Sequence, residues 1–282
     1  SMNPNYEKLG NAVRYFYDLQ KLRIQSGNRN SDQAAPAVLD DYDKAFLGRQ
    51  SEGLNALEKD ALKEVSRLLK GVPIWEKHFK DKSLCKGVGP TMAGVMIAEI
   101  DITRCDTVSA LWAYCGLAVD NKTGSAVKRS KGQKANWNPF LKTKVEHVLG
   151  GCLLKANNLV YRKLYDDYKH RKQNQLVAVC MLCAGSGVYE KKVCYNCEGK
   201  KHNVPWGRSD AHRNQAAIRY MVKMFLKDLW VRWRELEGLP VTEDYASAAL
   251  GRQHGDHGGM TVKTNPRTGE PYNPRQSNQV AP

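Results

Sequence analysis

The sequence predicts a mostly α-helical fold that carries one small cysteine-rich insertion with a short β-hairpin. Apolar residues recur at intervals of three and four along most of the chain, which is the spacing of the buried face of a helix. Outside the insertion, no segment alternates strands with helices. Four of the eight cysteines lie in a single short segment, and the helical spacing stops there.

An N-terminal helical region is predicted for residues 1–83. Its first helix is expected over residues 4–25, and the polar stretch 26–36 should end that helix. A second helix is expected over about 43–70. Its apolar stripe fits either packing within the domain or a coiled coil in a homodimer. The stripe consists of Leu54, Leu57, Ala61, Val65 and Leu68.

The main domain, a helical bundle, is predicted for residues 84–237. Two short helices are expected at its start, and one long helix is expected over about 139–173. A cysteine-rich segment at about 177–206 interrupts the helical pattern, which resumes over about 209–237. The remainder, residues 238–282, has almost no large apolar side chains. Because such a segment cannot offset the entropy lost on ordering, we expect a disordered tail.

The four clustered cysteines form the pattern C-x2-C-x10-C-x2-C. Two such turns, brought together by a hairpin, present four thiolates to one ion, which is the closed ligand set of structural zinc. Glycines behind the turns supply the positive φ angles that sharp bends need. We therefore predict one structural Zn²⁺ bound by Cys180, Cys183, Cys194 and Cys197. The other four cysteines are interpreted as small buried hydrophobic residues; they are Cys85, Cys105, Cys115 and Cys152.

The pattern C-x2-C-x-G-x-G at residues 180–187 resembles one repeat of the cysteine-rich region of DnaJ chaperones. This resemblance implies only the local geometry of a zinc-binding turn, because the chain contains no HPD tripeptide.

The stretch KGVGPTMAGVMIAEI at residues 86–100 places two glycines around one valine, directly before a proline and an apolar helical run. Pro90 suits the first position of a helix, and free N–H groups at a helix N-terminus attract anions. Glycine lets a phosphate approach the backbone without a Cβ in the way. The alternative is a turn that only packs closely between helices. The predicted phosphate contacts here are Lys86, Gly87, Val88, Gly89 and Thr91.

This turn resembles the helix-hairpin-helix element of DNA-binding proteins that do not read sequence. A longer stretch resembles the C-terminal transposase domain of DEDD-type insertion-sequence transposases and Piv-type invertases. The longer resemblance rests on Gly87–Pro90, Ala98–Ile100, Tyr114–Leu117, a basic loop at 122–134, and Asn138 with Leu141 and Lys142. It implies that the zinc finger is an insertion between the last two helices of that domain.

Two departures limit what the resemblance implies. The family's other half is a RuvC-like nuclease domain with four acidic metal ligands, and residues 1–83 show no strands for such a domain. The family also supplies a serine nucleophile beside a glycine in the basic loop, where this chain has Thr123-Gly124 and then Ser125. Thr123 and Ser125 are therefore only weak candidates for strand cleavage, and we predict no catalytic residue.

The chain carries 44 Lys and Arg against 29 Asp and Glu, a net charge of +15, which favours a polyanionic partner. We expect nucleic acid, DNA rather than RNA, and no membrane. The expected location is the cytoplasm of a bacterial or phage-infected cell, in association with the nucleoid. Further phosphate contacts are predicted on the basic loop and the finger, at Lys122, Lys128, Arg129, Lys131, Lys134, Lys191, Lys192, Lys200 and Lys201.

The sequence thus favours a non-catalytic DNA-binding protein encoded by a phage or mobile element. Two alternatives stay open. One is a recombinase that uses Thr123 or Ser125 together with a separate metal-bearing subunit. The other is a zinc-finger adaptor that regulates a recombinase or a replication complex.

Overall fold

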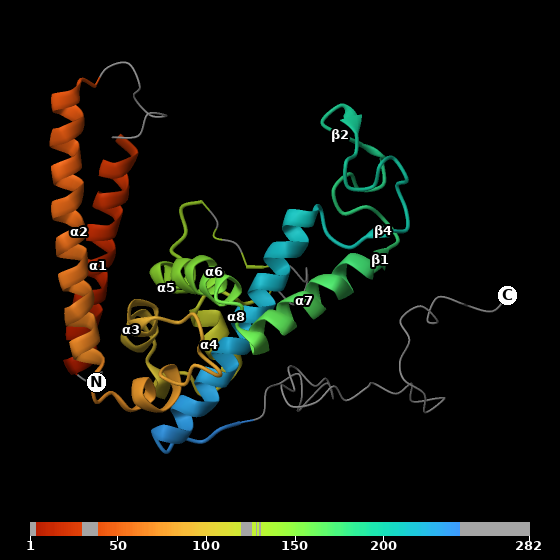
Figure 1. The fold of residues 1–282 in the computed structure, drawn as a ribbon. Coiled ribbons are helices and arrows are strands. Elements are labelled where there is room, and N and C mark those ends of the chain that lie inside the picture. The colour runs from red at the N-terminus through yellow and green to blue at the C-terminus, as the bar shows by residue number, and fades with distance from the viewer. Residues whose placement is uncertain (1–3, 30–38, 120–125, 128, 130, 243–282) are drawn as a thin grey trace. The chain divides into compact units, whose positions relative to one another are not determined.

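The computed structural model describes residues 4–29, 39–119, 126–127, 129 and 131–242. This part of the chain is mostly helical, as predicted, and its named strands lie in the cysteine-rich insertion (Figure 1). From residue 243 onward, the predicted disordered tail lies outside the described residues. None of the described helices is long and apolar enough to cross a membrane.

Two long helices, α1 (Pro4–Arg29) and α2 (Asp41–Leu69), pack against each other (Figure 1). The start of α2 is fixed by a capping box, in which the side chains of Asp40 and Asp43 each accept a hydrogen bond from the other's backbone N–H. Ala61 of the predicted apolar stripe is buried in a cluster with residues of α1. The stripe therefore packs within the domain, which is the first of its two predicted arrangements.

The glycine hairpin lies between two short helical elements, as predicted. The elements of this part are η1 (Trp75–Phe79, a π-helix), α3 (Pro90–Glu99), η2 (Ile102–Arg104, a 3₁₀-helix) and α4 (Val108–Tyr114). In α3, every residue from Met92 to Ala98 is buried, as expected for a helix that is apolar all round. Gly94 permits the close packing, because a Cβ there would lie 2.8 Å from Cγ2 of Val13 in α1.

The prediction of one long helix over residues 139–173 is wrong. The segment is divided into α5 (Pro139–Thr143), η3 (Lys144–Leu149, a π-helix), α6 (Gly150–Lys155) and α7 (Leu159–Asn174). Asn157 has a φ of +48°, which ends the first part, and asparagine tolerates this left-handed conformation better than most residues. The side chain of Asn158 then accepts a hydrogen bond from the backbone N–H of Tyr161 and caps α7.

The last helix, α8 (Asp210–Leu236), agrees closely with its predicted range. One hydrophobic core joins it to α1, α2, α3 and α4, so the region before residue 83 shares its core with the main domain. Trp230 is almost fully buried and donates a hydrogen bond to the carbonyl oxygen of Cys105. Of the four scattered cysteines, Cys152 is half-buried and the other three are buried, as predicted for small hydrophobic residues.

The insertion between α7 and α8 contains two short antiparallel pairs. Strand β1 (Leu176–Val177) pairs with β4 (Val204–Pro205), and β2 (Val188–Tyr189) pairs with β3 (Lys192–Val193). The second pair is the predicted hairpin, and the first closes the base of the insertion. We call residues 176–205 the finger.

Candidate metal centre and nucleic-acid interface

The four clustered cysteines meet at one point in the finger, and all four are buried. Their Sγ atoms lie within 4.8 Å of one another, with 3.9 Å between Cys180 and Cys194 and 3.7 Å between Cys183 and Cys197. Thiolates held about 2.3 Å from a central ion at tetrahedral corners lie about 3.8 Å apart. A disulfide would need about 2.05 Å between its sulfurs. The cluster therefore has the spacing of a closed four-thiolate site for one metal ion.

Two turns of nearly the same backbone geometry hold these cysteines. Behind the first pair, Ala184 and Gly185 have φ angles of +49° and +83°. Behind the second pair, Glu198 and Gly199 have φ angles of +49° and +79°. The glycines expected from the sequence therefore occupy positions where positive φ is required.

The two halves of the finger also repeat one long-range hydrogen bond. The backbone N–H of Cys194 donates to the carbonyl of Gly187 at 2.9 Å, and that of Cys180 donates to the carbonyl of Lys201 at 3.0 Å. Gly187 and Lys201 each follow the first cysteine of their half by seven positions, and their φ angles are +79° and +66°. Lys201 thus stands where the first half has a glycine, a strain that the sequence analysis missed.

Hydrogen bonds to sulfur favour the thiolate form of the cluster. The amide of Asn196 donates to Cys180 Sγ at 3.5 Å, and the N–H of Gly187 donates to Cys183 Sγ at 3.3 Å. Burial alone would raise the pKa of Cys180, but the hydrogen bonds from Asn196 and from backbone N–H groups outweigh it and lower that pKa to about 6. A partly ionised cluster of this kind is ready to bind a cation.

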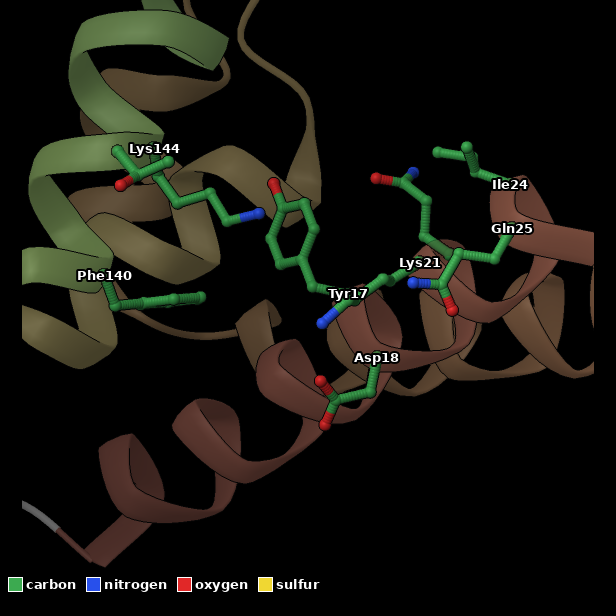
Figure 2. A pocket seen from close by; sticks show the side chains of 9 residues that line it. Tyr17, Asp18, Lys21, Ile24, Gln25, Phe140 and Lys144 are labelled. Carbon is green, nitrogen blue, oxygen red and sulfur yellow. The ribbon is translucent and has the colours of Figure 1, made fainter. Parts of the chain in front are cut away.

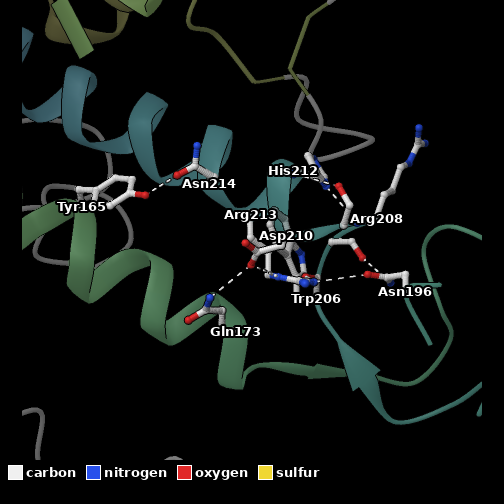
Figure 3. Close-up of polar contacts among 11 residues, drawn as sticks. Tyr165, Gln173, Asn196, Trp206, Arg208, Asp210, His212, Arg213 and Asn214 are labelled. Atoms are coloured by element: carbon white, nitrogen blue, oxygen red, sulfur yellow. Dashed lines mark hydrogen bonds and ion pairs between the residues drawn. The ribbon is translucent and has the colours of Figure 1, made fainter. Parts of the chain in front are cut away.

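A polar network joins the finger to the start of α8 (Figure 3). Asn196 also donates to the carbonyl of Gly207 at 2.9 Å, and Arg213 donates to the carbonyl of Trp206 at 3.1 Å. The ring of Trp206 stacks on that of His212, with 5.3 Å between their centroids. The residue that supports a cysteine thus also supports the junction with the helical core.

The glycine hairpin is held from behind by residues far away in sequence. The side-chain amide of Asn158 donates to the carbonyls of Leu84 and Lys86, at 2.7 and 3.2 Å. Gly87 has a φ of +96°, and a Cβ there would lie 2.6 Å from the carbonyl oxygen of Cys152. Glycine at position 87 is therefore required for packing against α6, which is the alternative that the sequence analysis had left open for this turn.

The remaining hairpin residues differ in what they leave exposed. Val88 is buried, and its N–H donates to the carbonyl of Cys85, so this amide is already used within the turn. Gly89, the N-cap of α3, has no atom within 4 Å of the place where a Cβ would be. Lys86 is exposed and Thr91 is half-buried. The open approach to the backbone is therefore at Gly89 rather than across the whole turn.

Several residues on which the family resemblance rests come together in space. Asn138 caps α5 and donates from its amide to Glu99 at 2.6 Å and to the hydroxyl of Tyr114 at 3.3 Å. Gly116 has a φ of +69°, and a Cβ there would lie 2.6 Å from the side chain of Lys142. These residues thus form the junction between α3, α4 and α5 that positions the hairpin.

The predicted basic residues are exposed wherever the structure describes them. In the loop, Arg129, Lys131 and Lys134 are exposed, and Arg129 donates to the carbonyl of Gln133 at 3.0 Å. Four other predicted residues of this loop lie outside the described residues: Lys122, Thr123, Ser125 and Lys128. The finger lysines are also exposed; they are Lys191, Lys192, Lys200 and Lys201.

The hairpin and the finger are connected to opposite ends of α7. Asn158 at its start holds the hairpin, and β1 of the finger follows its end. A helix of sixteen residues is about 24 Å long. The structure therefore does not gather the predicted contacts into one cluster.

An aromatic and cationic row along α7 and α8 was missed by the sequence analysis. Tyr168 stacks on Tyr220 with 4.6 Å between ring centroids, and Arg171 lies 5.0 Å from the centre of the Tyr168 ring. Lys172 lies 5.7 Å from the centre of the same ring and 4.4 Å from that of Trp206. The spacing of the aromatic and basic residues in YDDYKHRK was the available signal, but the partners on α8 are visible only in the fold.

One comparison with known proteins gives a match. Residues 83–147 match the model of the transposase IS116/IS110/IS902 family. The match supports a transposase-like domain in this part of the chain. It covers the hairpin, α3, α4, α5 and the basic loop, and it ends before the finger. No curated protein and no solved structure matches the chain.

Proposed function

We propose that this protein binds DNA without cleaving it, through the glycine hairpin and the basic loop. The observation that carries the proposal is the transposase-family match over residues 83–147, since that segment contains both features. The net charge of +15 agrees with a polyanionic partner. The open backbone at Gly89, beside the exposed Lys86, offers a place for a phosphate at the start of α3.

The finger holds one zinc ion in this proposal, and the ion is structural. Four thiolates leave no coordination position for water or substrate, so the metal stabilises the finger rather than taking part in catalysis. The exposed finger lysines then provide phosphate contacts at the far end of α7. Contacts of this kind position a protein on DNA without reading its sequence.

Equilibrium binding to a labelled duplex at several salt concentrations tests this function. The purified protein should bind plain duplex, and its affinity should fall steeply as salt rises, because released counterions drive such binding. Replacing Arg129, Lys131 and Lys134 together with alanine should flatten the log–log salt dependence by about one unit for each lost phosphate contact.

A matched control is the triple alanine variant of Lys59, Lys63 and Lys70 on α2, which removes the same charge away from the hairpin. Equal effects of the two triple variants would reduce the loop to a source of net charge. Failure of the wild-type protein to bind DNA at low salt would refute the proposal.

The family match also favours one rival, an active recombinase that uses Thr123 or Ser125 with a separate metal-bearing subunit. This reading predicts a covalent protein–DNA adduct that disappears in Thr123→Val or Ser125→Ala. Detection of such an adduct would replace the non-catalytic proposal. Without an adduct and without DNA binding, the adaptor function is the remaining hypothesis.

A further inference from the structure

A groove between α1 and the α5–η3 segment is not used by the interactions described above (Figure 2). Its volume is about 440 Å³, within the range of about 300–1,000 Å³ found for sites that bind small molecules. Lys21 and Gln25 line it from α1, and Phe140 and Lys144 line it from the other side. Cations, amides and aromatic rings therefore meet in one concave surface.

Lys144 is the central cation of this groove. Its Nζ lies 3.1 Å from the centre of the Tyr17 ring and 5.4 Å from that of Phe140 (Figure 2). Burial lowers the pKa of Lys144, while the nearby Asp18 acts in the opposite direction. Ring faces hold this ammonium without neutralising it, so its charge remains available to an anion.

The groove lies next to the first turn of α3. The side chain of Thr91 interacts with the hydroxyl of Tyr17, which lines the groove. Thr91 follows the open N-cap Gly89 by two positions. A DNA strand whose phosphate contacts Gly89 is thus brought close to the groove.

We propose that this groove binds a single unstacked nucleotide of DNA. Its phosphate is held by Lys144 and Lys21, and its base lies against the apolar wall formed by Phe140 and Ile24. This inference rests on the proposed function, because it specifies which DNA the protein prefers. A paired base inside a duplex hides its faces, so only a base that has left the stack can enter a groove of this kind.

A second groove, along α2, shows why charge alone does not explain the first. It has a volume of about 500 Å³ and is lined by Lys59, Leu62, Lys63, Ser66, Arg67 and Lys70. It is equally basic, but it has no aromatic lining. Its Lys63 and Arg67 are paired with Asp60 and Glu64. This groove attracts anions and offers no ring to a base, which makes it the natural control.

Two DNA ligands of the same sequence test the inference: a duplex closed by loops at both ends, and the same duplex with one unpaired nucleotide in its middle. The wild-type protein should prefer the second ligand by about tenfold. Lys144→Ala should abolish that preference, and Lys21→Ala should reduce it. Lys59→Ala should leave it unchanged. Asp18→Asn should strengthen it, because a negative charge beside the phosphate is removed.

Lys21 is exposed, so its variant tests the groove even if Lys144→Ala proves unstable in a thermal melt. Equal wild-type affinity for the two ligands would overturn the groove assignment, and so would equal effects of Lys144→Ala and Lys59→Ala. In both cases retained duplex binding leaves the proposed function standing. Absence of binding to either ligand would refute both proposals.

Discussion

The helical core and the finger are held together by different interactions. The core is one hydrophobic cluster that runs from α1 to α8 and includes the fully buried Phe225, Trp230 and Trp233. The buried residues of the finger are its four cysteines and Val204, and each of its strands has two residues. Units below about 40 residues usually need a metal or disulfides to fold. The apolar pattern therefore specifies the core, and the ligand set specifies the finger.

Removal of the metal is the strongest way to break this comparison. Chelation should unfold the finger and leave the helical content of the core almost unchanged, because the core has its own buried surface. Metal analysis should give one zinc per chain, and Cys180→Ser with Cys194→Ser should lose it. Circular dichroism and hydrogen exchange before and after chelation measure the two regions separately. Global loss of helix on chelation would show that the core depends on the finger.

Two glycines of the hairpin allow a comparison within the core. Gly87→Ala should destabilise the fold by about 2–4 kcal/mol, because the new Cβ meets the α6 backbone and the φ angle is positive. Gly89→Ala should cost less than about 1 kcal/mol, since its Cβ points into open space and its φ is ordinary. Urea denaturation measures both costs. Under the proposed function, Gly89→Ala weakens duplex binding more than it weakens the fold.

A smaller effect is expected at the residue that holds the hairpin. Asn158→Ser keeps a side chain that can cap α7 but removes the amide that donates to Leu84 and Lys86. The unpaired carbonyls should cost about 1–3 kcal/mol. The control is Asn138→Ser, in which a cap is also preserved but the lost amide contacts are with Glu99 and Tyr114. Unchanged stability of Asn158→Ser would mean that water replaces the amide.

The extent to which sequence predicts this structure follows the distance along the chain over which each feature is decided. The C-x2-C turns are local, so their spacing and glycines were sufficient to predict a four-cysteine cluster. The helix break at Asn157 and Asn158 is also local, but the apolar stripe continues across it and led to a wrong prediction. The packing role of Gly87 depends on Cys152 in another helix. Such contacts are decided by tertiary packing and leave no pattern near the glycine.

The groove beside the hairpin illustrates the same limit. Tyr17 and Lys144 lie in segments that the sequence analysis treated as separate regions, and neither residue was singled out. Each reads as an ordinary member of an amphipathic helix. Their meeting depends on how α1 packs against α3 and α5, which the apolar spacing of α1 predicts only as burial.

The smallest expected effect lies in the near-symmetry of the finger. Lys201 adopts a φ of +66° at the position equivalent to Gly187. Because a side chain in this conformation costs about 1 kcal/mol relative to glycine, Lys201→Gly should stabilise the folded finger. The expected result is a rise of about fivefold in the chelator concentration that removes half of the zinc. Lys200→Gly removes the same charge where φ is not positive, and it should show no such gain. If both variants hold zinc equally well, the gain comes from the lost charge rather than from the relaxed backbone.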